Sequence, residues 1–425
     1  MNIHDETRIV VTGMGAVSPL GCGVDKVWPR ILAGQSGIAR LPEALVAGVG
    51  CTVGGRVPER AEDPEAGFDA SQTIASKDLK KMDRFVEFAL VAAHEALTQA
   101  RWFPDQARQQ ARTATVIASG IGGFGSILDA VHTTGTKGPG RLSPFSAPTF
   151  LANMASGHAS IRYGFKGPLG TPVTACAAGV QAIGDAARLI RAGEADIALC
   201  GGAEAAMHRV SLAAFAAAKA LSRSFNDSPQ VASRPFDTLR DGFVMAEGAG
   251  LLVIERLEHA LQRGATPLAE LVGYGTTADA YHLTAGPENG EGARRAMELA
   301  IAQAGIGPGD VHHINAHATS TQVGDRAELG AMSALFGHRR DLLVSATKSS
   351  TGHMLGAAGG IEAIFTVLAL RDQIVPPTLN LKIPDPAAEG LTLVAGQARR
   401  AALDYALSNG FGFGGVNASV LFRRW

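Results

Sequence analysis

Short apolar runs rich in β-branched residues alternate along this chain with longer segments in which apolar residues recur three and four positions apart. The short runs end in glycine or polar residues and predict buried strands, whereas the longer segments predict helices. In the first half we expect strands at Arg8–Thr12, Thr113–Ser119, Thr171–Ala175, Asp196–Gly201 and Gly250–Glu255, and helices at Val86–Ala100, Leu151–Arg162 and Ala178–Ala192.

The same alternation begins again in the second half, although no sequence repeat is visible. Alternating strands and helices predict an α/β fold with mainly parallel sheets covered by helices. Charged or Gly- and Pro-rich insertions interrupt the pattern at Gly50–Lys81 and Thr133–Pro148. The second-half strands are expected at Leu268–Tyr274, Val311–Asn315, Leu342–Thr347, Tyr405–Ser408 and Ala418–Phe422, and the helices at Glu291–Ala304, Asp325–Phe336 and Gly356–Leu370.

The composition is that of an ordinary globular protein, with 46% hydrophobic and 18% charged residues in a chain of 425. A formal net charge of -1 gives no overall attraction to nucleic acid or to an anionic membrane, so a charged partner must meet a local patch. Four cysteines without paired spacing argue against a disulfide framework or a metal site and favour the cytoplasm. The segment Met1–Glu6 lacks the features of a secretory signal, and we expect no membrane insertion.

Cys176 stands where an apolar run meets the predicted helix Ala178–Ala192. Backbone N–H groups and the dipole at a helix N-terminus stabilise a thiolate, so we expect a lowered thiol pKa and a nucleophile here. A buried structural cysteine is the commoner role for a lone Cys, and the local sequence alone leaves both roles open. Cys200 lies inside an apolar run and is expected in the core.

Two histidines, His317 and His353, each follow an apolar run and lie among small residues, a setting that exposes side chains at a sheet edge. Two neutral imidazoles that donate to one carbonyl oxygen would stabilise an enolate. Lys348, Asp325 and Glu328 are either solvated ion-pairing residues or groups that fix the protonation and orientation of the histidines.

Two glycine-rich segments could expose backbone N–H groups. The predicted strand–turn–strand Asn409–Asn417 could complete an oxyanion hole with the N–H of Cys176, although a plain tight turn has the same composition. Gly13-Met14-Gly15 resembles the start of a dinucleotide fingerprint, but Ser18 stands where the third glycine should be. That departure argues against a nicotinamide-dependent dehydrogenase.

Six segments of this chain resemble those of the β-ketoacyl-acyl carrier protein synthases and occur in that family's order and spacing. The likeness is strongest to the bacterial elongating members of the family. The resemblance covers almost the whole chain and implies a thiolase-like fold of two similar halves in five layers, α-β-α-β-α, that forms a homodimer. The expected halves are 1–257, with the nucleophile, and 258–425, with both catalytic histidines. The segments are Val173–Gly179, Asn315–Thr321, Lys348–His353, Asn409–Asn417, Ser233–Asp237 and Arg240–Val244.

The resemblance implies a role for each matching residue. Cys176 matches the acylated nucleophile, His317 and His353 the decarboxylation pair, and Lys348 the lysine of the family's site, with Asp325 and Glu328 behind them. Phe413 matches the gating residue whose N–H joins the oxyanion hole. The expected substrate contacts are Thr319, Thr321, Thr284, Ile121 and Phe411. Ala318, the pair Ala177-Ala178 and Ala246 depart from the family's usual residues, which puts substrate preference in doubt more than reaction type.

The implied reaction is decarboxylating condensation in fatty-acid elongation, without metal or organic cofactor because departing carbon dioxide generates the carbanion. A ketosynthase subunit of a type II polyketide or specialised lipid pathway is the alternative. A thiolase would need a second catalytic cysteine where His353 stands, and a catalytically silent partner should lack Cys176 or a histidine.

The expected partner is an acidic acyl carrier protein. The best candidate for its docking surface is the basic segment around Lys77, Lys80, Lys81 and Arg84, with Arg223 as a further candidate. A run of charges is more often a solvated helix face, so the family resemblance, and not the charge pattern, favours docking.

Overall fold

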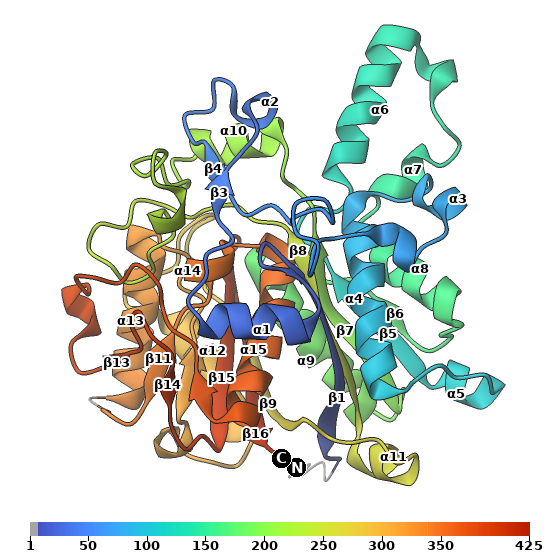
Figure 1. The fold of residues 1–425 in the computed structure, drawn as a ribbon. Helices are drawn as coiled ribbons and strands as arrows, with labels where there is room; N and C mark the ends of the chain where they lie inside the picture. Colours follow the sequence, from blue (N-terminus) through green and yellow to red (C-terminus); the bar gives the residue numbers. More distant parts are fainter. Residues whose placement is uncertain (1–6, 338) are drawn as a thin grey trace.

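The computed structural model describes residues 7–337 and 339–425, so Met1–Glu6, on which the expectation about secretion rests, lie outside the described residues. Alternating layers of strands and helices form the molecule (Figure 1). The main strands of the first half are β1 (Ile9–Ser18), β5 (Thr113–Ala118), β6 (Leu169–Gly170), β7 (Ile197–Glu204) and β8 (Gly248–Arg256). Those of the second half are β9 (Ala269–Ala278), β10 (His313–Asn315), β11 (Leu343–Ser345), β13 (Thr392–Leu393), β15 (Tyr405–Gly412) and β16 (Val416–Arg424).

The two halves have equivalent sheets. The first half runs in the order β6-β5-β7-β8-β1, and the second runs β11-β10-β15-β16-β9, with β13 added beyond β11. In each, the first two pairings are parallel and the next two antiparallel. The echo between the halves is therefore confirmed. The expectation of mainly parallel sheets holds for the direction of most strands, but the sheets are mixed, because β8 and β16 each run antiparallel to both neighbours.

A short pairing joins the two half-sheets. Val10 of β1 lies opposite Glu270 of β9, and Val11 lies opposite Ala269, both antiparallel. Beyond this pairing the strands of the two halves contact each other through the helices packed between them. The two halves thus share a core while each keeps its own sheet.

The helices complete a five-layer arrangement, as the fold expectation required. The central layer consists of α9 (Ala178–Arg191) and α15 (Ala358–Asp372), which contact each other and strands of both halves. One outer layer contains α4 (Arg84–Ala100) and α8 (Met154–Tyr163), and the other contains α12 (Glu291–Gln303) and α13 (Gln322–Phe336). Every residue of α15 from Ala358 to Leu370 is buried, as expected of a helix that is apolar on all sides.

Most predicted elements lie within a few residues of the observed ones, but the strand predicted at Thr171–Ala175 is wrong. The strand β6 covers only Leu169–Gly170, and the chain then turns into a short 3₁₀ helix, Ala175–Ala177. Pro172 has no N–H group to donate, so the ladder with β5 cannot continue through it. Apolar residues in this segment therefore form a loop that leads into α9.

Gly13 and Gly15 of β1 serve helix packing. A Cβ on Gly13 would lie 2.1 Å from the carbonyl oxygen of Ala96 in α4, and one on Gly15 would lie 1.9 Å from that of Ala92. Only glycine lets β1 approach α4 this closely. The partial dinucleotide fingerprint is thus explained by strand–helix contact.

The two predicted insertions lie above and beside the sheets. Gly50–Lys81 contains the short strand β4 (Val53–Gly54) and the helix α3 (Ser76–Leu79). Thr133–Pro148 forms the outer part of a hairpin that projects from the body, built by α6 (Phe124–Lys137) and α7 (Ser146–Phe150) (Figure 1). The sequence pattern did not predict α6.

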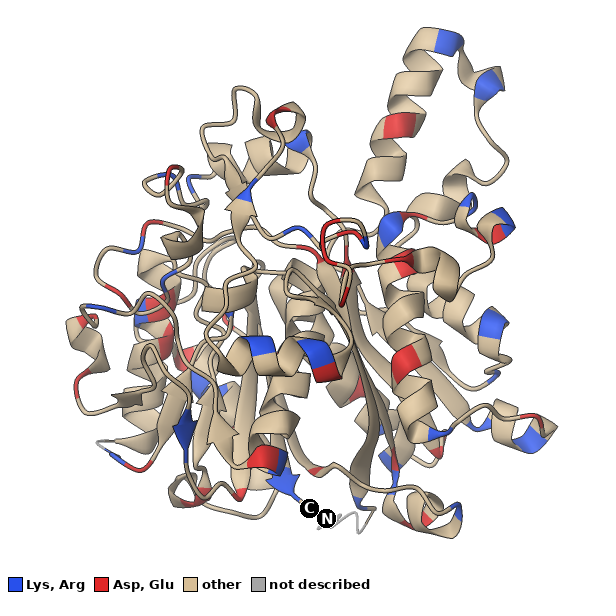
Figure 2. Ribbon diagram, viewed as in Figure 1, with Lys and Arg blue, Asp and Glu red and all other residues tan. Residues whose placement is uncertain are grey.

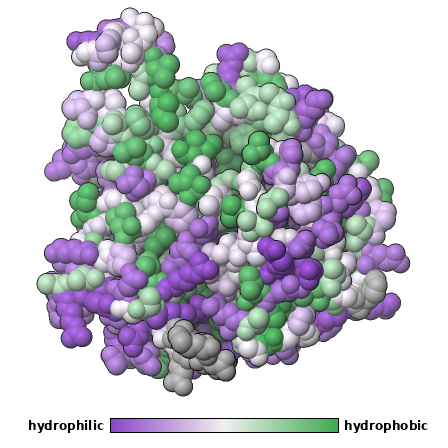
Figure 3. Space-filling view, turned by 180° about the vertical axis from the view of Figure 1, so that it is seen from behind, coloured by the Kyte–Doolittle hydropathy of each residue, from purple (hydrophilic) through white to green (hydrophobic). Residues whose placement is uncertain are grey.

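The surface mixes charges of both signs, and Lys and Arg alternate with Asp and Glu over most elements (Figure 2). Apolar side chains gather on the opposite face along the projecting hairpin and below it (Figure 3). In the described part of the chain, no helix is both long and apolar enough to cross a membrane.

Candidate active site

Cys176 lies in the 3₁₀ turn Ala175–Ala177, directly before the first residue of α9. Ala175 has the left-handed φ of 49°, a conformation that turns the chain sharply and presents Cys176 to a cavity. This cavity has a volume of about 520 Å³ and is also lined by His317 and His353. Residues from both halves of the chain therefore meet at one site.

The thiol of Cys176 is not acidic, contrary to the expectation from its helix N-terminus. Burial raises its pKa to about 12, against a smaller lowering by the charge of Lys348 and by backbone groups of Phe413 and of Cys176 itself. The residue keeps partial access to the cavity, but protein atoms surround the sulfur and remove the water that would solvate a thiolate. Cys176 thus rests as a neutral thiol beside two backbone groups that stabilise negative charge.

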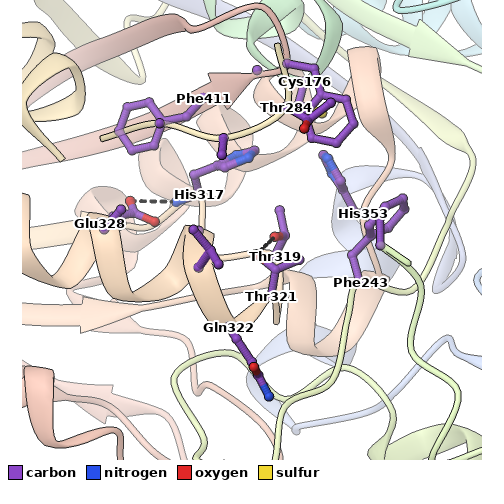
Figure 4. A pocket seen from close by; sticks show the side chains of 18 of the residues that line it. Cys176, Phe243, Thr284, His317, Thr319, Thr321, Gln322, Glu328, His353 and Phe411 are labelled. Carbon is purple, nitrogen blue, oxygen red and sulfur yellow. Dashed lines mark hydrogen bonds between the residues drawn. The ribbon is translucent and has the colours of Figure 1, made fainter. Parts of the chain in front are cut away.

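His317 and His353 face each other and point toward Cys176 (Figure 4). Their ring centroids are 5.4 Å apart and the rings are nearly perpendicular. His317 also packs against Phe411, and His353 against Phe243. Among the described residues, no hydrogen-bond partner is found for Nδ1 of His317 or for either ring nitrogen of His353. These buried nitrogens have no competing partner there, and both rings line the cavity.

Both imidazoles are neutral at ordinary pH. Burial lowers the pKa of each well below 6.5, and the positive charge of Lys348 lowers it further. His353 adds to the lowering at His317. A neutral imidazole still carries one N–H donor, so the pair can stabilise an oxyanion without gaining a proton beforehand.

Glu328 and Asp325 hold the backbone of the loop that carries His317. Glu328 accepts the N–H groups of His317 at 2.9 Å and Ala318 at 2.7 Å, and Asp325 accepts those of Ser320 at 3.1 Å and Thr321 at 3.2 Å. Neither carboxylate is hydrogen-bonded to an imidazole in the described part of the chain, and their role in the protonation and orientation of the histidines stays a prediction. They fix the position of the histidine through the main chain, because both lie on α13 below the loop.

Lys348 is buried and forms an ion pair with Glu362, with Nζ and Oε1 2.6 Å apart. The sequence analysis missed Glu362. Its signal was a single acidic residue within the otherwise apolar helix segment 358–370. A buried charge of that kind needs a partner. The pair keeps a positive charge near Cys176 and the histidines, as the shared influence of Lys348 on their pKa values indicates.

The glycine turn joins β15 to β16 beside Cys176. A Cβ on Gly412 would lie 3.2 Å from the backbone nitrogen of Cys176 and 2.7 Å from the carbonyl oxygen of Thr174, so the two main chains touch. Phe413 follows directly and its side chain is 40% exposed at the cavity. Backbone groups of Cys176 and Phe413 thus lie together, as an oxyanion hole requires.

The expected substrate contacts divide into two groups. Thr284, Thr319, Thr321 and Phe411 line the cavity, and the hydroxyl groups of Thr319 and Thr321 are 3.1 Å apart. Ile121 does not line this cavity but packs against the buried apolar cluster that Cys176 also contacts. Cys200 is fully buried in β7, as expected.

The predicted docking residues differ in how free they are. Lys77 and Lys80 are exposed on and beside α3. Lys81 pairs with Asp78 at 3.0 Å, and Arg84 pairs with Glu59 at 2.7 Å and stacks on two phenylalanine rings. Arg223 is exposed, but its guanidinium donates to the carbonyl oxygen of Ala216. Lys219, which the sequence analysis did not select, lines the cavity itself.

Comparison with known proteins gives a consistent result over the whole chain. Residues 6–260 match the model of the beta-ketoacyl synthase N-terminal domain, and residues 268–382 match that of the beta-ketoacyl synthase C-terminal domain. The chain is 48% identical over 419 residues to the 3-oxoacyl-[acyl-carrier-protein] synthase 2 of Rhizobium meliloti (strain 1021), covering 98% of this chain and 99% of the relative.

Solved structures are similar as well. A beta-ketoacyl synthase from Burkholderia phymatum STM815 superposes with a TM-score of 0.90 at 34% identity, covering 99% of this chain and 100% of the other. A type II polyketide ketosynthase, solved in complex with its acyl-carrier protein and bound to a hexaketide, superposes with a TM-score of 0.88 at 32% identity, covering 99% of both chains.

Proposed function

The chain belongs to the beta-ketoacyl synthase family, and we propose that it is the acyltransferase that condenses acyl-acyl carrier protein with malonyl-acyl carrier protein in fatty-acid elongation. The product is a 3-oxoacyl-acyl carrier protein longer by two carbons. One observation carries the proposal: a cysteine thiol shares a cavity with two neutral imidazoles, three of whose four ring nitrogens have no hydrogen-bond partner among the described residues. The reaction takes place in the cytoplasm, as the reduced cysteines favour.

The first step transfers the acyl group to Cys176. The sulfur attacks the thioester carbonyl, and the N–H groups of Cys176 and Phe413 bind the oxygen that becomes negative. The bond to the carrier's thiol then breaks. Because the pKa of Cys176 is about 12, its proton leaves only as the new bond forms, to a neighbouring neutral imidazole and then to the departing thiolate.

The second step makes the carbon–carbon bond. Loss of carbon dioxide from the malonyl group leaves its electron pair as an enolate, whose oxygen accepts hydrogen bonds from His317 and His353. The enolate carbon attacks the acyl carbonyl on Cys176, and the carbon–sulfur bond breaks to release a thiolate, which takes up a proton from solvent to restore the thiol. Phe411 and Phe243 pack against the two rings and hold them in this orientation.

Fatty-acid elongation is favoured over polyketide synthesis by similarity. The relative named 3-oxoacyl-[acyl-carrier-protein] synthase 2 is 48% identical to this chain, whereas the polyketide ketosynthase is 32% identical. Elongation is tested by incubating the protein with a ladder of acyl-carrier proteins and malonyl-carrier protein, followed by mass spectrometry of the intact carriers. We expect 3-oxoacyl products extended by a single two-carbon unit. Products extended by several unreduced units would favour the polyketide function instead.

The acyl carrier protein docks on exposed cations. Lys77 and Lys80 carry this part of the proposal, because Arg84 is already engaged by Glu59 and by aromatic rings. Lys219 at the cavity adds a further positive charge on the path of the carrier's arm. Charges at the rim of an interface act mainly on association and are screened over about 8 Å at physiological salt.

Docking is tested with the double variant Lys77→Glu/Lys80→Glu. We expect KM for acyl-carrier protein to rise several-fold at low salt and the difference from the parent to shrink as salt is added. Reaction with a small acyl-pantetheine should stay unchanged. Lys26→Glu, an exposed lysine on the helix α1 (Val24–Leu32), is the matched control. An equal loss with both substrates would contradict docking at α3.

The family resemblance also implies a homodimer, and exposed apolar side chains support it. These side chains lie on the projecting hairpin, on α8 and around β6, which ends the sheet among the described residues (Figure 3). Light scattering coupled to gel filtration should give twice the chain mass, and replacing Val131 with Glu, at 64% exposure on α6, should shift the equilibrium toward the single chain. The exposed set is Val131, Leu142, Phe145, Leu151, Ile161, Leu169 and Val173.

A further inference from the structure

Glu204 is a fully buried carboxylate that none of the steps above uses. It is the last residue of β7, and its two oxygens accept four hydrogen bonds. Oε2 accepts the N–H groups of Gly120 at 2.7 Å and Gly356 at 3.0 Å, while Oε1 accepts the hydroxyl of Ser119 at 3.1 Å and the N–H of Ile121 at 3.3 Å. The carboxylate thus binds the loop after β5 to the turn before α15.

The backbone of Ile121 is tightly fixed within the loop that Glu204 holds. The hydroxyl of Ser119 also accepts the N–H of Gly122 at 2.9 Å, so donors on both sides of Ile121 are fixed. A Cβ on Gly120 would lie 2.6 Å from Oε2 of Glu204, and one on Gly356 would lie 2.2 Å from the nitrogen of Gly120. Ile121 then packs against the same apolar cluster as Cys176, together with Leu355.

The equivalent loop in the other half is also held by a buried carboxylate that accepts backbone N–H groups. The loop after β10 carries His317, and Glu328 accepts its successive N–H groups. The loop after β5, in the equivalent place of the first half, carries Ile121, and Glu204 accepts its successive N–H groups. In both halves a buried carboxylate fixes the main chain of the loop, which brings His317 to the cavity in one half and Ile121 to the apolar cluster that Cys176 also contacts in the other.

We propose that Glu204 is a positioning residue that fixes the Ser119–Gly122 loop and, through Ile121, sets which acyl chain lengths Cys176 accepts. This inference rests on the proposed function, since it concerns the acyl group of the first step. Burial raises the pKa of Glu204 to about 7, and the four hydrogen bonds that it accepts oppose this rise by stabilising the charged form. An amide in its place could not accept from all four donors.

The test compares Glu204→Gln with Ile121→Ala and with the double variant. For each, kcat/KM of acyl transfer to Cys176 is measured with short and long acyl-carrier proteins, beside the melting temperature. We expect the long-to-short ratio to rise about tenfold in both single variants, the lower range of discrimination by an apolar pocket. The double variant should show no further rise, because one residue acts through the other.

Glu95→Gln is the matched control. Glu95 is partly buried, accepts the N–H groups of Ala16 and Val24, and has a pKa raised to about 7, but it lies on α4 away from Cys176. It should lower the melting temperature without changing the long-to-short ratio. Should Glu204→Gln not fold, Ser119→Ala, which removes one donor from Glu204, should raise the ratio in the same direction.

Two outcomes would overturn the positioning role. One is a loss of rate in Glu204→Gln that is equal for all chain lengths, so that the long-to-short ratio stays unchanged as it should in Glu95→Gln. The other is a double variant whose ratio is the product of the two single changes. A parent protein that transfers no acyl group to Cys176 would instead contradict the proposed function, so the two failures are distinct.

Discussion

The helices α9 and α15 begin in nearly the same way but end up with opposite chemistry. Each is preceded by a 3₁₀ turn, Ala175–Ala177 or Leu355–Ala357, and each turn starts with a residue in the left-handed conformation, at φ of 49° or 47°. The second residue is Cys176 in one turn and Gly356 in the other. The end of the neighbouring strand is Gly412 in β15 and Glu204 in β7.

That last difference decides what each helix N-terminus can bind. Gly412 has no side chain, so the N–H groups of Cys176 and Phe413 face an open cavity. At the N-terminus of α15 the carboxylate of Glu204 occupies the equivalent place and accepts the N–H of Gly356. A helix N-terminus attracts an anion. In one half the chain leaves that position to a transient oxyanion, and in the other it fills the position permanently.

Removing the thiol of Cys176 should have the largest effect, because it removes the main chemical difference between the turns before α9 and α15. In Cys176→Ala the two turns become almost alike, and we expect condensation to fall by about a thousandfold or more, since the acyl intermediate cannot form. Intact-protein mass spectrometry should show no acyl label. Cys200→Ala, at a buried position in β7, should label normally. An acyl group retained by Cys176→Ala would disprove the assignment of the nucleophile.

Removing one imidazole should affect the second step more than the first. His317→Ala and His353→Ala each lose one donor to the enolate oxygen, which costs roughly a hundred- to a thousandfold in rate. Release of carbon dioxide from malonyl-carrier protein measures this step, and acyl labelling of Cys176 measures the first. Normal decarboxylation by both variants would show that the histidines have another role.

A methyl group added at Gly412, at the end of β15, or at Gly356, in the turn before α15, should affect the two helix N-termini differently. In Gly412→Ala the Cβ would press on the backbone at Cys176, and we expect acyl transfer to fall by about a hundredfold for every chain length, since an oxyanion donor is displaced. In Gly356→Ala the Cβ would press on Gly120 beside Glu204, so the loss should depend on chain length. Identical chain-length profiles for the two variants would mean that the two ends do not differ in function.

The smallest effect should come from pH. Because burial and Lys348 hold the pKa of both imidazoles well below 6.5, the histidines stay neutral, and decarboxylation should be nearly constant between about pH 6 and 8. Protonation removes activity only when the pH falls toward these lowered pKa values. A rate that halves near pH 6.5 would show instead that a group titrating there takes part, either an imidazole with an ordinary pKa or one of the buried carboxyl groups of Asp325 and Glu362, whose pKa burial raises to about 7.

The sequence indicates the groups that we propose to react but not the groups that hold them in place. Cys176, His317 and His353 lie in local contexts that point to a site, because each follows an apolar run and precedes small residues. The partners of Glu204 lie 84 and 152 residues away, and no local pattern connects them. The raised pKa of Cys176 was missed for the same reason: the helix N-terminus is local, whereas the burial that outweighs it comes from residues distant along the chain.

The fold, like the site, could be predicted from the sequence only in part. The alternation of strands and helices gave the two related halves and nearly all their elements. It did not give the antiparallel return of β8 and β16, since a fully buried strand has the same composition in either direction. Nor did it give α6, whose residues are all at least partly exposed and so lack a buried apolar stripe.

The short pairing between β1 and β9 has a consequence for the newly made chain. Cys176 belongs to the half that leaves the ribosome first, whereas His317, His353 and Phe413 follow more than a hundred residues later. Domains of this size begin to fold during synthesis. Until the second sheet docks, the cysteine is an ordinary thiol without a proton acceptor or a completed oxyanion hole. Thioesters in the cell therefore meet a reactive enzyme only after both halves have folded together.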